Sequence, residues 1–375
     1  MKILLVEPYY TGSHAAWAAG YAAHSRHEVM LLTLPGRFWK WRMHGGAITL
    51  ARQFLVMEIT PDLILATDML DLTTFLALTR ARTCHLPTAI YFHENQLSYP
   101  WSPTDRDVKQ GRSLHYGFIN YASALVADAV FFNSRYHLGS FLAELPLLLK
   151  HFPDHNELDT VEGVRARSEV LPLGLDLRRF DAYRPDPRTS TSGAPPLILW
   201  NHRWEYDKNP QEFLQALYVL ADRGLDFGLA ILGERFREQP AEFIEARHRL
   251  GKRVRHFGYV PDFASYARWL WQADLLPVTS YQDFFGASVV EAIYCGCLPL
   301  LPRRLSYPEL IPPEYHRLCF YQDFDDLVDR LEAVIRNPDP MRQPGLRQVM
   351  ARFDWSEMAT IYDDRLEAVV GQAKR

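Results

Sequence analysis

The 375-residue sequence predicts an α/β protein built from two doubly wound domains, each with a parallel sheet. Short apolar runs alternate with amphipathic helical patterns along most of the chain, and this alternation is typical of parallel sheets. Residues 178–196 interrupt it: they are rich in Arg, Asp, Pro, Ser and Thr and lack apolar periodicity, which indicates a linker. Because ligands of such sheets bind at the carboxyl ends of the strands, we expect two Rossmann-like domains that face a ligand-binding cleft.

Each expected strand is an apolar run with polar or turn residues at its ends. The first series of strands is expected at Lys2–Val6, Glu28–Leu32, Leu63–Ala66, Thr88–Phe92, Ala129–Phe132 and Glu169–Leu171. Helices with apolar residues at helical spacing are expected between them, for example at Ala15–His24, Leu72–Arg82, Ser113–Ala127 and Tyr136–Leu145. The second series of strands is expected at Leu197–Asn201, Gly228–Leu232, Val254–Phe257, Leu275–Val278 and Leu298–Leu301.

The domain boundaries follow from this order of elements. Residues 1–177 are expected to form an N-terminal domain, residues 178–196 a linker and residues 197–352 a C-terminal domain. Residues 353–375 are expected to hold a last helix, in which apolar side chains recur at helical spacing. These side chains are Met358, Ile361, Tyr362, Leu366 and Val369.

The composition is that of a folded protein, with 48% hydrophobic and 23% charged residues. The four cysteines suggest no disulfide framework and suit a reducing compartment. The apolar run Lys2–Val6 is too short for a signal peptide or a membrane span, so we expect a cytoplasmic protein without a membrane partner. The net charge of −4 provides no general attraction for nucleic acid, so any RNA contact must come from a local patch.

Residues 283–291 combine an acidic residue, a Phe-Gly step and a second carboxylate eight positions after the first. Phe285 and Gly286 let the chain pass close to a diphosphate and, with Ala287, open a helix whose first N–H groups can bind it. Further along that helix, the Glu291 carboxylate can accept hydrogen bonds from both hydroxyls of a ribose. Asp283 lies just before the helix, where sugar hydroxyls would sit. The pattern predicts one side of a nucleotide-sugar site; the alternative is an ordinary strand–loop–helix with solvated acids.

Two cations, Arg203 and Lys208, lie in the loop after the expected strand Leu197–Asn201. A diphosphate leaving group develops negative charge as its bond to the sugar breaks, and a guanidinium and an ammonium directed at it stabilise that charge. Either cation alone would be interpreted as an ordinary surface charge. Together with the acidic pair at 283 and 291, and at the ends of strands, they predict a site that handles a sugar diphosphate.

These motifs resemble the retaining glycosyltransferases of the GT-B fold, the large family often called GT4. The motifs of that family's donor domain occur in nearly the same order in this chain, at residues 203–208, 257–261, 273–274 and 283–292. Within the family, the chain looks like the tRNA-queuosine mannosyltransferases. The sequence motifs that indicate this narrower resemblance are spread over nearly the whole chain. The most specific of them lie in the N-terminal half, at residues 7–14, 34–42 and 91–100.

The resemblance implies GDP-mannose as the donor and the cyclopentenediol of queuosine, at the wobble position of tRNA(Asp), as the acceptor. It also implies that the anomeric configuration of the sugar is retained and that the leaving diphosphate accepts the proton of the attacking hydroxyl. The catalytic residues that the resemblance implies are Arg203, Lys208, His93 and Asp283. The last helix would cross back onto the N-terminal domain. The family usually has Glu where this chain has Asp283, so the carboxylate reaches less far toward the sugar. No Asp-x-Asp pair lies at the donor strand end, and we therefore expect no cofactor and no essential metal.

Two segments of the N-terminal half are predicted to contribute to the same site. Gly12 and His14 lie in the loop after the first strand. This loop resembles the family's glycine loop, which approaches the donor or acceptor with backbone N–H groups; a tight turn is the alternative. His93 directly follows the strand Thr88–Phe92, and the resemblance implies a hydrogen bond from it to the donor sugar. Its polar neighbours Glu94 and Asn95 are assigned, with His14, to the acceptor.

The segment from Arg37 to His44 interleaves aromatic and cationic side chains. Unstacked RNA bases stack on such rings while phosphates meet the charges, so the segment is a candidate for contact with the anticodon loop. The residues assigned to tRNA binding here are Arg37, Trp39, Lys40, Trp41 and Arg42. The alternative is a loop whose tryptophans pack inside the domain. Arg106, Lys109 and Arg112 form a second, weaker cationic stretch.

Two other functions stay open from the sequence. The first is a GT-B enzyme that uses another donor sugar, or a lipid, polysaccharide or small-molecule acceptor. A lipid acceptor would favour a basic amphipathic helix, and the sequence has no clear one. The second is a non-catalytic binding protein that keeps the fold, for which the replacement at Asp283 is the only hint. Retention of Arg203, Lys208 and Glu291 together argues against it.

Overall fold

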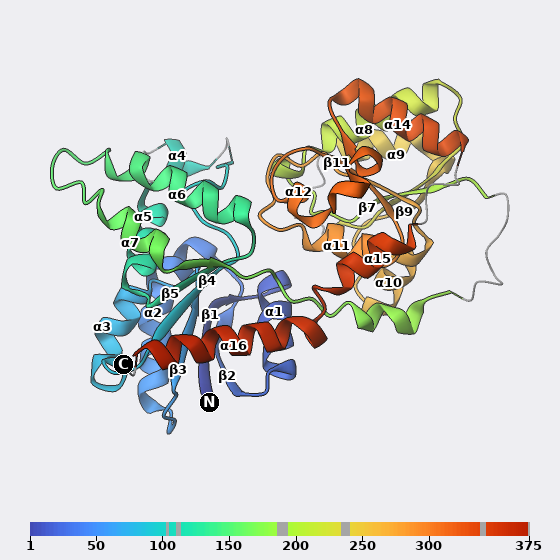
Figure 1. Cartoon of the computed structure of the whole chain (residues 1–375). Helices are drawn as coiled ribbons and strands as arrows, with labels where there is room; N and C mark the ends of the chain where they lie inside the picture. The colour runs from blue at the N-terminus through green and yellow to red at the C-terminus, as the bar shows by residue number, and fades with distance from the viewer. Residues whose placement is uncertain (103–104, 110–113, 186–193, 234–240, 338–342, 374–375) are drawn as a thin grey trace. The chain divides into compact units, whose positions relative to one another are not determined.

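The computed structural model describes residues 1–102, 105–109, 114–185, 194–233, 241–337 and 343–373. The chain divides into two compact units (Figure 1). Unit 1 comprises residues 1–175 and 353–375, and unit 2 comprises residues 176–352. Unit 2 is therefore inserted, in sequence, between the main part of unit 1 and its last helix.

Unit 1 contains a six-stranded parallel sheet of order β2-β1-β3-β4-β5-β6. Its strands are β1 (Lys2–Tyr10), β2 (Glu28–Pro35), β3 (Leu63–Thr67), β4 (Thr88–Phe92), β5 (Ala129–Phe132) and β6 (Ser168–Val170). Its helices are α1 (Gly12–His24), α2 (Trp39–Val56), α3 (Leu72–Thr83), α4 (Arg106–Lys109), α5 (Leu114–Val126), α6 (Arg135–Leu149), α7 (Thr160–Ala166) and α16 (Trp355–Ala373). The strand order reverses between β1 and β3, so ligands are expected at the carboxyl ends of those strands.

Unit 2 contains a second six-stranded parallel sheet, of order β12-β11-β10-β7-β8-β9. Its strands are β7 (Leu197–Trp200), β8 (Gly228–Ile231), β9 (Val254–Phe257), β10 (Leu275–Pro277), β11 (Leu298–Pro302) and β12 (Phe320–Tyr321). Its α-helices are α8 (Pro210–Asp222), α9 (Ala241–Leu250), α10 (Phe263–Gln272), α11 (Ala287–Tyr294), α12 (Tyr307–Leu310), α13 (His316–Cys319), α14 (Phe324–Arg336) and α15 (Pro344–Ala351). Its 3₁₀ helices are η1 (Arg178–Tyr183), η3 (Tyr206–Lys208), η4 (Gly251–Arg253) and η5 (Pro313–Tyr315). This is the Rossmann strand order, with its reversal between β7 and β10.

The two parallel sheets confirm the predicted α/β class, but three elements differ from the sequence analysis. Residues 178–183, assigned to the linker, form η1, and Phe180 is buried against Phe263 with ring centroids 4.8 Å apart. Residues 186–193 of the linker lie outside the described residues. No helix was predicted over α2, whose interior carries Gly45 and Gly46, and the short strand β12 was not predicted. Glycine lowers helix propensity, but here it provides room for packing, because a Cβ on Gly45 would lie 2.5 Å from the Trp41 ring.

The last helix, α16, belongs to unit 1 and packs on α1, as its position beside the N-terminal elements in Figure 1 shows. Trp17 donates from its indole N–H to the Tyr362 hydroxyl over 3.0 Å. The Asp363 carboxylate accepts hydrogen bonds from the hydroxyls of Tyr21 and Ser25, over 2.8 and 2.6 Å. All these groups are buried or half-buried, so each bond satisfies a polar atom removed from water. The predicted return of the last helix to the N-terminal part of the chain is confirmed.

Among the described residues, no helix is both long enough and apolar enough to cross a membrane.

The contact between α1 and α16 leads to a stability prediction at Gly20. A Cβ on Gly20 would lie 2.0 Å from Nε1 of the buried Trp355, so Gly20→Ala must displace that ring. We expect the substitution to lower the free energy of unfolding by about 1–3 kcal/mol, although alanine favours helices. The matched control is Gly139→Ala in α6, where no heavy atom lies within 4 Å, and stability is expected to rise by up to ~1 kcal/mol. Urea unfolding measures both; an unchanged midpoint for Gly20→Ala would contradict the packing.

Candidate active site

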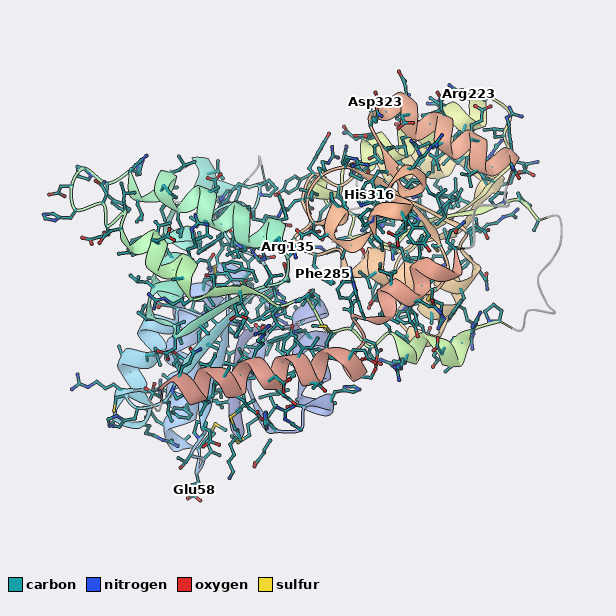
Figure 2. All side chains as sticks on the ribbon, in the orientation of Figure 1. Glu58, Arg135, Arg223, Phe285, His316 and Asp323 are labelled. Atoms are coloured by element: carbon teal, nitrogen blue, oxygen red, sulfur yellow. The ribbon has the colours of Figure 1, made fainter. Side chains whose placement is uncertain are left out.

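Polar side chains gather at the carboxyl ends of the strands where the order of each sheet reverses. In unit 2 these are the loop after β7, residues 201–209, and the loop after β10, residues 278–286. Figure 2 labels Phe285, which lies in the second loop just before α11. In unit 1 they are the end of β1 with the start of α1, and the loops after β3 and β4.

Lys208 joins the two loops of unit 2. Its side chain is 10% exposed, and its ammonium donates to the Gln282 carbonyl oxygen over 2.7 Å. The same ammonium lies 3.3 Å from Asp207 Oδ2 and 3.7 Å from Asp283 Oδ2. The structure therefore brings together two of the residues that the sequence analysis assigned to catalysis, Lys208 and Asp283.

Arg203, the other predicted cation, lies in a different environment. Its side chain is 48% exposed, and Nη2 lies 3.2 Å from Glu205 Oε2. Burial raises the pKa of Glu205, and the Arg203 charge acts in the opposite direction. Arg203 is thus a half-exposed guanidinium at the edge of the site, whereas Lys208 is a buried ammonium inside it.

The Phe-Gly step has the backbone that the motif predicted. Gly286 has a φ of 91°, in the left-handed region that favours glycine, and it directly precedes Ala287, the first residue of α11. The Ser306 hydroxyl donates to the Phe285 carbonyl oxygen over 3.0 Å, and the Tyr307 hydroxyl donates to Asp283 Oδ2 over 3.2 Å. The loop is therefore held by side chains from the segment that leads into α12.

Glu291 lies on α11 and accepts a hydrogen bond from the Tyr266 hydroxyl over 2.7 Å. Burial raises the pKa of Glu291 to about 7, although the Tyr266 hydrogen bond acts to lower it. A carboxyl group with this pKa changes its charge near neutral pH, and its ionised form accepts hydroxyl hydrogen bonds more strongly than its protonated form.

Three polar residues that the sequence analysis did not assign to the site also lie at this edge. They are Asn201 and His202 after β7 and Ser280 after β10. Their atoms Oδ1, Nε2 and Oγ are buried and have no hydrogen-bond partner among the described residues. Burial and the nearby Lys208 lower the pKa of His202 to about 3, so its ring is neutral. Buried polar atoms without partners are rare in folded proteins and mark a place where a ligand can bind. In the sequence, the signal that could have identified these three residues is their position at or just after the end of an expected strand.

In unit 1, Glu7 and His14 form a buried pair at the end of β1, with 3.0 Å between Glu7 Oε2 and His14 Nδ1. Burial alone would lower the pKa of His14, but the Glu7 carboxylate raises it to about 9, aided by Asp68 and Glu94. His14 therefore carries a positive charge at neutral pH. Gly12, the first residue of α1, has a φ of 51°, and a Cβ built there would meet no heavy atom within 4 Å.

The His93 ring packs beside the His14 ring, with centroids 4.3 Å apart and planes tilted by 40°. Burial and the His14 charge hold the pKa of His93 well below its usual range, so this ring is neutral. Its backbone N–H donates to Asp68 Oδ1 over 2.8 Å, and its buried Nε2 has no hydrogen-bond partner among the described residues. Burial raises the pKa of Asp68. A charged and a neutral imidazole thus lie side by side at the reversal point of the sheet.

Glu94 and Asn95, which follow His93, also bond within the chain. Glu94 Oε1 accepts from the Gln96 side-chain amide over 2.8 Å. Asn95 is fully buried, and its Oδ1 accepts from the backbone N–H groups of Leu97 and Ser98 over 3.1 and 2.9 Å. These bonds of Asn95 shape the loop after β4.

The predicted RNA-binding segment is the start of α2 rather than a loop. Lys40 lies between Asp105 and Asp107, at 2.6 and 2.5 Å, and Arg42 Nε donates to the Pro35 carbonyl oxygen over 3.0 Å. Trp39 packs with Trp101 and Tyr116, at centroid distances of 5.9 and 5.1 Å. Arg37 is exposed, as is Trp41, at 62%. The described part of the second cationic stretch is Arg106, which is exposed; Arg112 lies outside the described residues.

Glu7, His14 and His93 are the one group among the described residues whose geometry fits a metal ion, with one ligand atom from each within 4.8 Å of the others. A histidine ligand must give up its proton to bind a metal. Because the pKa of His14 is raised to about 9, that proton competes with a metal at neutral pH.

The predicted role of Glu291 in binding a ribose diol gives a pH dependence. With a pKa of about 7, Glu291 is protonated below neutral pH, so nucleotide-sugar affinity is expected to be constant above this pKa and to fall as the pH drops through it. Calorimetric titration with an intact nucleotide sugar, whose phosphate diesters do not titrate in this range, measures the profile. Glu291→Gln should flatten it, and the exposed control Glu314→Gln should leave it unchanged. A profile identical in Glu291→Gln and wild type would refute the role.

Both the N-terminal and the C-terminal part of the sequence match models of known protein families. Residues 2–175 match the family model of the tRNA-queuosine alpha-mannosyltransferase N-terminal region, and residues 186–348 match that of glycosyl transferases group 1. The tRNA-queuosine alpha-mannosyltransferase of Drosophila melanogaster is 32% identical over 91% of this chain and 89% of its own length. A GDP-mannose-dependent alpha-(1-6)-phosphatidylinositol dimannoside mannosyltransferase of Mycobacterium tuberculosis is 24% identical over 51% of this chain and 49% of its own length.

Solved structures of glycosyltransferases share the fold across the whole chain. HepE of Anabaena in complex with UDP has a TM-score of 0.68 at 16% identity, covering 98% of this chain and 100% of its own. Sucrose-phosphate synthase of Thermosynechococcus elongatus has a TM-score of 0.70 at 15% identity, covering 99% and 100%. At these identities the likeness shows the GT-B fold alone. The Drosophila relative and the matched N-terminal region show more: the chain belongs to the tRNA-queuosine alpha-mannosyltransferase family and is a hexosyltransferase of the GT-B fold.

Proposed function

We propose that the chain transfers mannose from GDP-mannose to the cyclopentenediol of queuosine at the wobble position of tRNA(Asp), with retention of configuration. The observation that carries the proposal is the 32% identity, over 91% of the chain, to a protein named for this transfer. The N-terminal part, residues 2–175, matches the model of that same family.

The proposed donor site is the edge of unit 2 between β7 and β10. Support for GDP-mannose comes from the names of the mycobacterial relatives, which are GDP-mannose-dependent mannosyltransferases. In this proposal Lys208 and Arg203 bind the diphosphate, and the backbone at Phe285, Gly286 and Ala287 approaches it at the start of α11. Glu291 accepts hydrogen bonds from the ribose hydroxyls.

The proposed chemistry needs charge stabilisation more than covalent catalysis. As the bond between mannose and diphosphate breaks, negative charge grows on the leaving oxygen, and the Lys208 ammonium and the Arg203 guanidinium stabilise it. That oxygen then accepts the proton of the queuosine hydroxyl that attacks the sugar. Asp283, already held by Lys208 and Tyr307 at 3.7 and 3.2 Å, is proposed to bind mannose hydroxyls despite its shorter side chain.

The proposed acceptor side is the edge of unit 1. The buried Nε2 of the neutral His93 is proposed to hydrogen-bond the donor sugar, and the positively charged His14 to orient the acceptor. Gly12, with open space above its backbone, is proposed to approach the donor phosphates. The chain is proposed to act in the cytoplasm, which suits its four free cysteines, and to require neither cofactor nor metal.

The proposed function predicts one hexose added to queuosine. Purified protein, tRNA(Asp) containing queuosine and GDP-mannose should yield mannosyl-queuosine, detected by mass spectrometry of the wobble nucleoside, with or without a metal chelator. Transfer only from another nucleotide sugar would show that GDP-mannose is not the donor. Transfer only to a lipid such as phosphatidylinositol would show that queuosine in tRNA is not the acceptor. Donor binding without transfer to either acceptor would favour a non-catalytic protein.

The proposed role of Lys208 predicts a large loss of turnover. Lys208→Ala is expected to lower kcat about 10²–10³-fold, because a buried charge that stabilises the leaving group is lost. The matched control is Lys252→Ala, which removes an exposed cation of the same unit and should keep wild-type turnover. Since Lys208 also pairs with two carboxylates, circular dichroism must show that the variant is folded. Full turnover in folded Lys208→Ala would contradict the mechanism.

A further inference from the structure

A pocket of about 780 Å³ lies in unit 1, and its lining includes none of the residues assigned to catalysis, to the donor or to tRNA binding. Its walls come from α2, α5 and the segment after α6, the helix that begins at Arg135, labelled in Figure 2. The lining side chains that carry the argument are His44, His115, Tyr116, Phe118, His151 and Phe152. Pockets of this size bind small-molecule ligands, so the volume is sufficient for a nucleoside.

Four of the lining rings, those of His115, Phe118, His151 and Phe152, are exposed, whereas His44 is half-buried and Tyr116 is buried. His44 and His115 have ring centroids 4.5 Å apart. Phe118 and Phe152 are 6.0 Å apart and nearly perpendicular, and they are 42% and 40% exposed. Neighbouring Leu114 is also exposed, at 42%. Large apolar side chains that gather at a pocket and stay exposed indicate a binding surface.

The polar groups in the pocket suit a nucleobase better than a lipid chain. Burial and the neighbouring His115 lower the pKa of His44, so this ring is neutral at neutral pH and can both donate and accept a hydrogen bond. An unstacked base needs both an aromatic surface for stacking and hydrogen-bonding partners for its edge. An acyl chain would leave the imidazoles without partners.

Exposed cations are sequence neighbours of the lining residues and can contribute contacts to a phosphate backbone. The exposed Arg106 directly precedes the lining residue Asp107, and the exposed Lys150 directly precedes His151. At the other side, His44 ends the aromatic and cationic segment that begins at the exposed Arg37. A base-binding pocket with cations beside it is the arrangement found in proteins that bind single-stranded RNA.

Helix α5 connects the pocket to the proposed acceptor site. Asn120 on this helix accepts from the Gln96 backbone N–H and donates to the Asp68 carbonyl oxygen, both over 2.8 Å. A Cβ on Gly117 would lie 2.5 Å from Leu97, so the helix packs closely against the loop after β4. From His115 to Asn120 the helix rises roughly 8 Å, a short span for an extended RNA strand.

We propose that this pocket binds one unstacked nucleobase of the acceptor tRNA, packed face-on against one of the Phe118 and Phe152 rings and edge-on against the other, and hydrogen-bonded by His44 and His115. The inference rests on the proposed function, because it takes tRNA as the acceptor. It assigns the base contact to His44 of α2, to α5 and to the segment after α6, while Lys40 and Trp39 of the earlier candidate segment hold the aromatic cluster beside the pocket.

Substitution of the two phenylalanines tests the pocket. Phe118→Ala and Phe152→Ala should each weaken binding of queuosine-containing tRNA(Asp) by about 5- to 150-fold, the range for loss of one base–aromatic stack. Phe152→Tyr, which keeps the ring, should bind as wild type does. The control Leu78→Ala removes an equally exposed apolar side chain on α3 of the same unit and should change nothing. Affinity is measured by fluorescence anisotropy, and donor affinity, measured by calorimetry, should stay constant in all four variants.

The outcomes separate this inference from the proposed function. If wild type modifies the tRNA but both alanine variants bind it unchanged, the pocket assignment is wrong and the function stands. If wild type adds no hexose to the tRNA, the proposed function itself fails. If wild type, but neither alanine variant, binds phosphatidylglycerol vesicles while tRNA affinity is unchanged, the pocket is a lipid site and the inference is overturned.

Discussion

The packing of Trp355 between two glycines is the constraint on which unit 1 depends. A Cβ on Gly20 or on Gly174 would lie 2.0 or 2.4 Å from this ring, so both positions must lack a side chain. The backbone pairs at the same place: Leu175 N–H donates to the Phe353 carbonyl oxygen over 2.8 Å, and Trp355 N–H donates to the Leu175 carbonyl oxygen over 2.9 Å. The chain thus leaves unit 1 and returns to it through one short pair of backbone segments, and the indole covers that junction.

Both sheets place their most unusual electrostatics where the strand order reverses. In unit 2, Lys208 lies among carboxylates while the neighbouring His202 is neutral; in unit 1, the charged His14 lies beside the neutral His93. In each case burial and a neighbouring charge separate the charge states of adjacent groups. Such arrangements are common at functional sites, because they hold polar groups ready for a ligand rather than for each other. The geometry therefore marks these two edges as the candidate site.

The sequence predicted most of the fold because buried parallel strands are continuous apolar runs, as in β3 and β4, where every residue is buried. It did not predict α2, since the pair Gly45 and Gly46 suggests a break and their packing partners are known only from the structure. Within the candidate site, Asp283, Gly286 and Glu291 could be proposed together from the sequence because they are close in it. Asn201, His202 and Ser280 were missed because they meet only when β7 and β10 pair across 77 residues. The difference between the buried Lys208 and the half-exposed Arg203 likewise depends on tertiary burial.

The insertion of unit 2 within unit 1 has a consequence for synthesis of the protein. Helix α16 supplies Tyr362 and Asp363 to the core beside α1, yet it is translated after all of unit 2. Until it emerges from the ribosome, the face of α1 that carries Trp17 and Tyr21 has no covering helix. Unit 2, whose residues are contiguous, can complete its core first, so the second half of the polypeptide is expected to mature before the first.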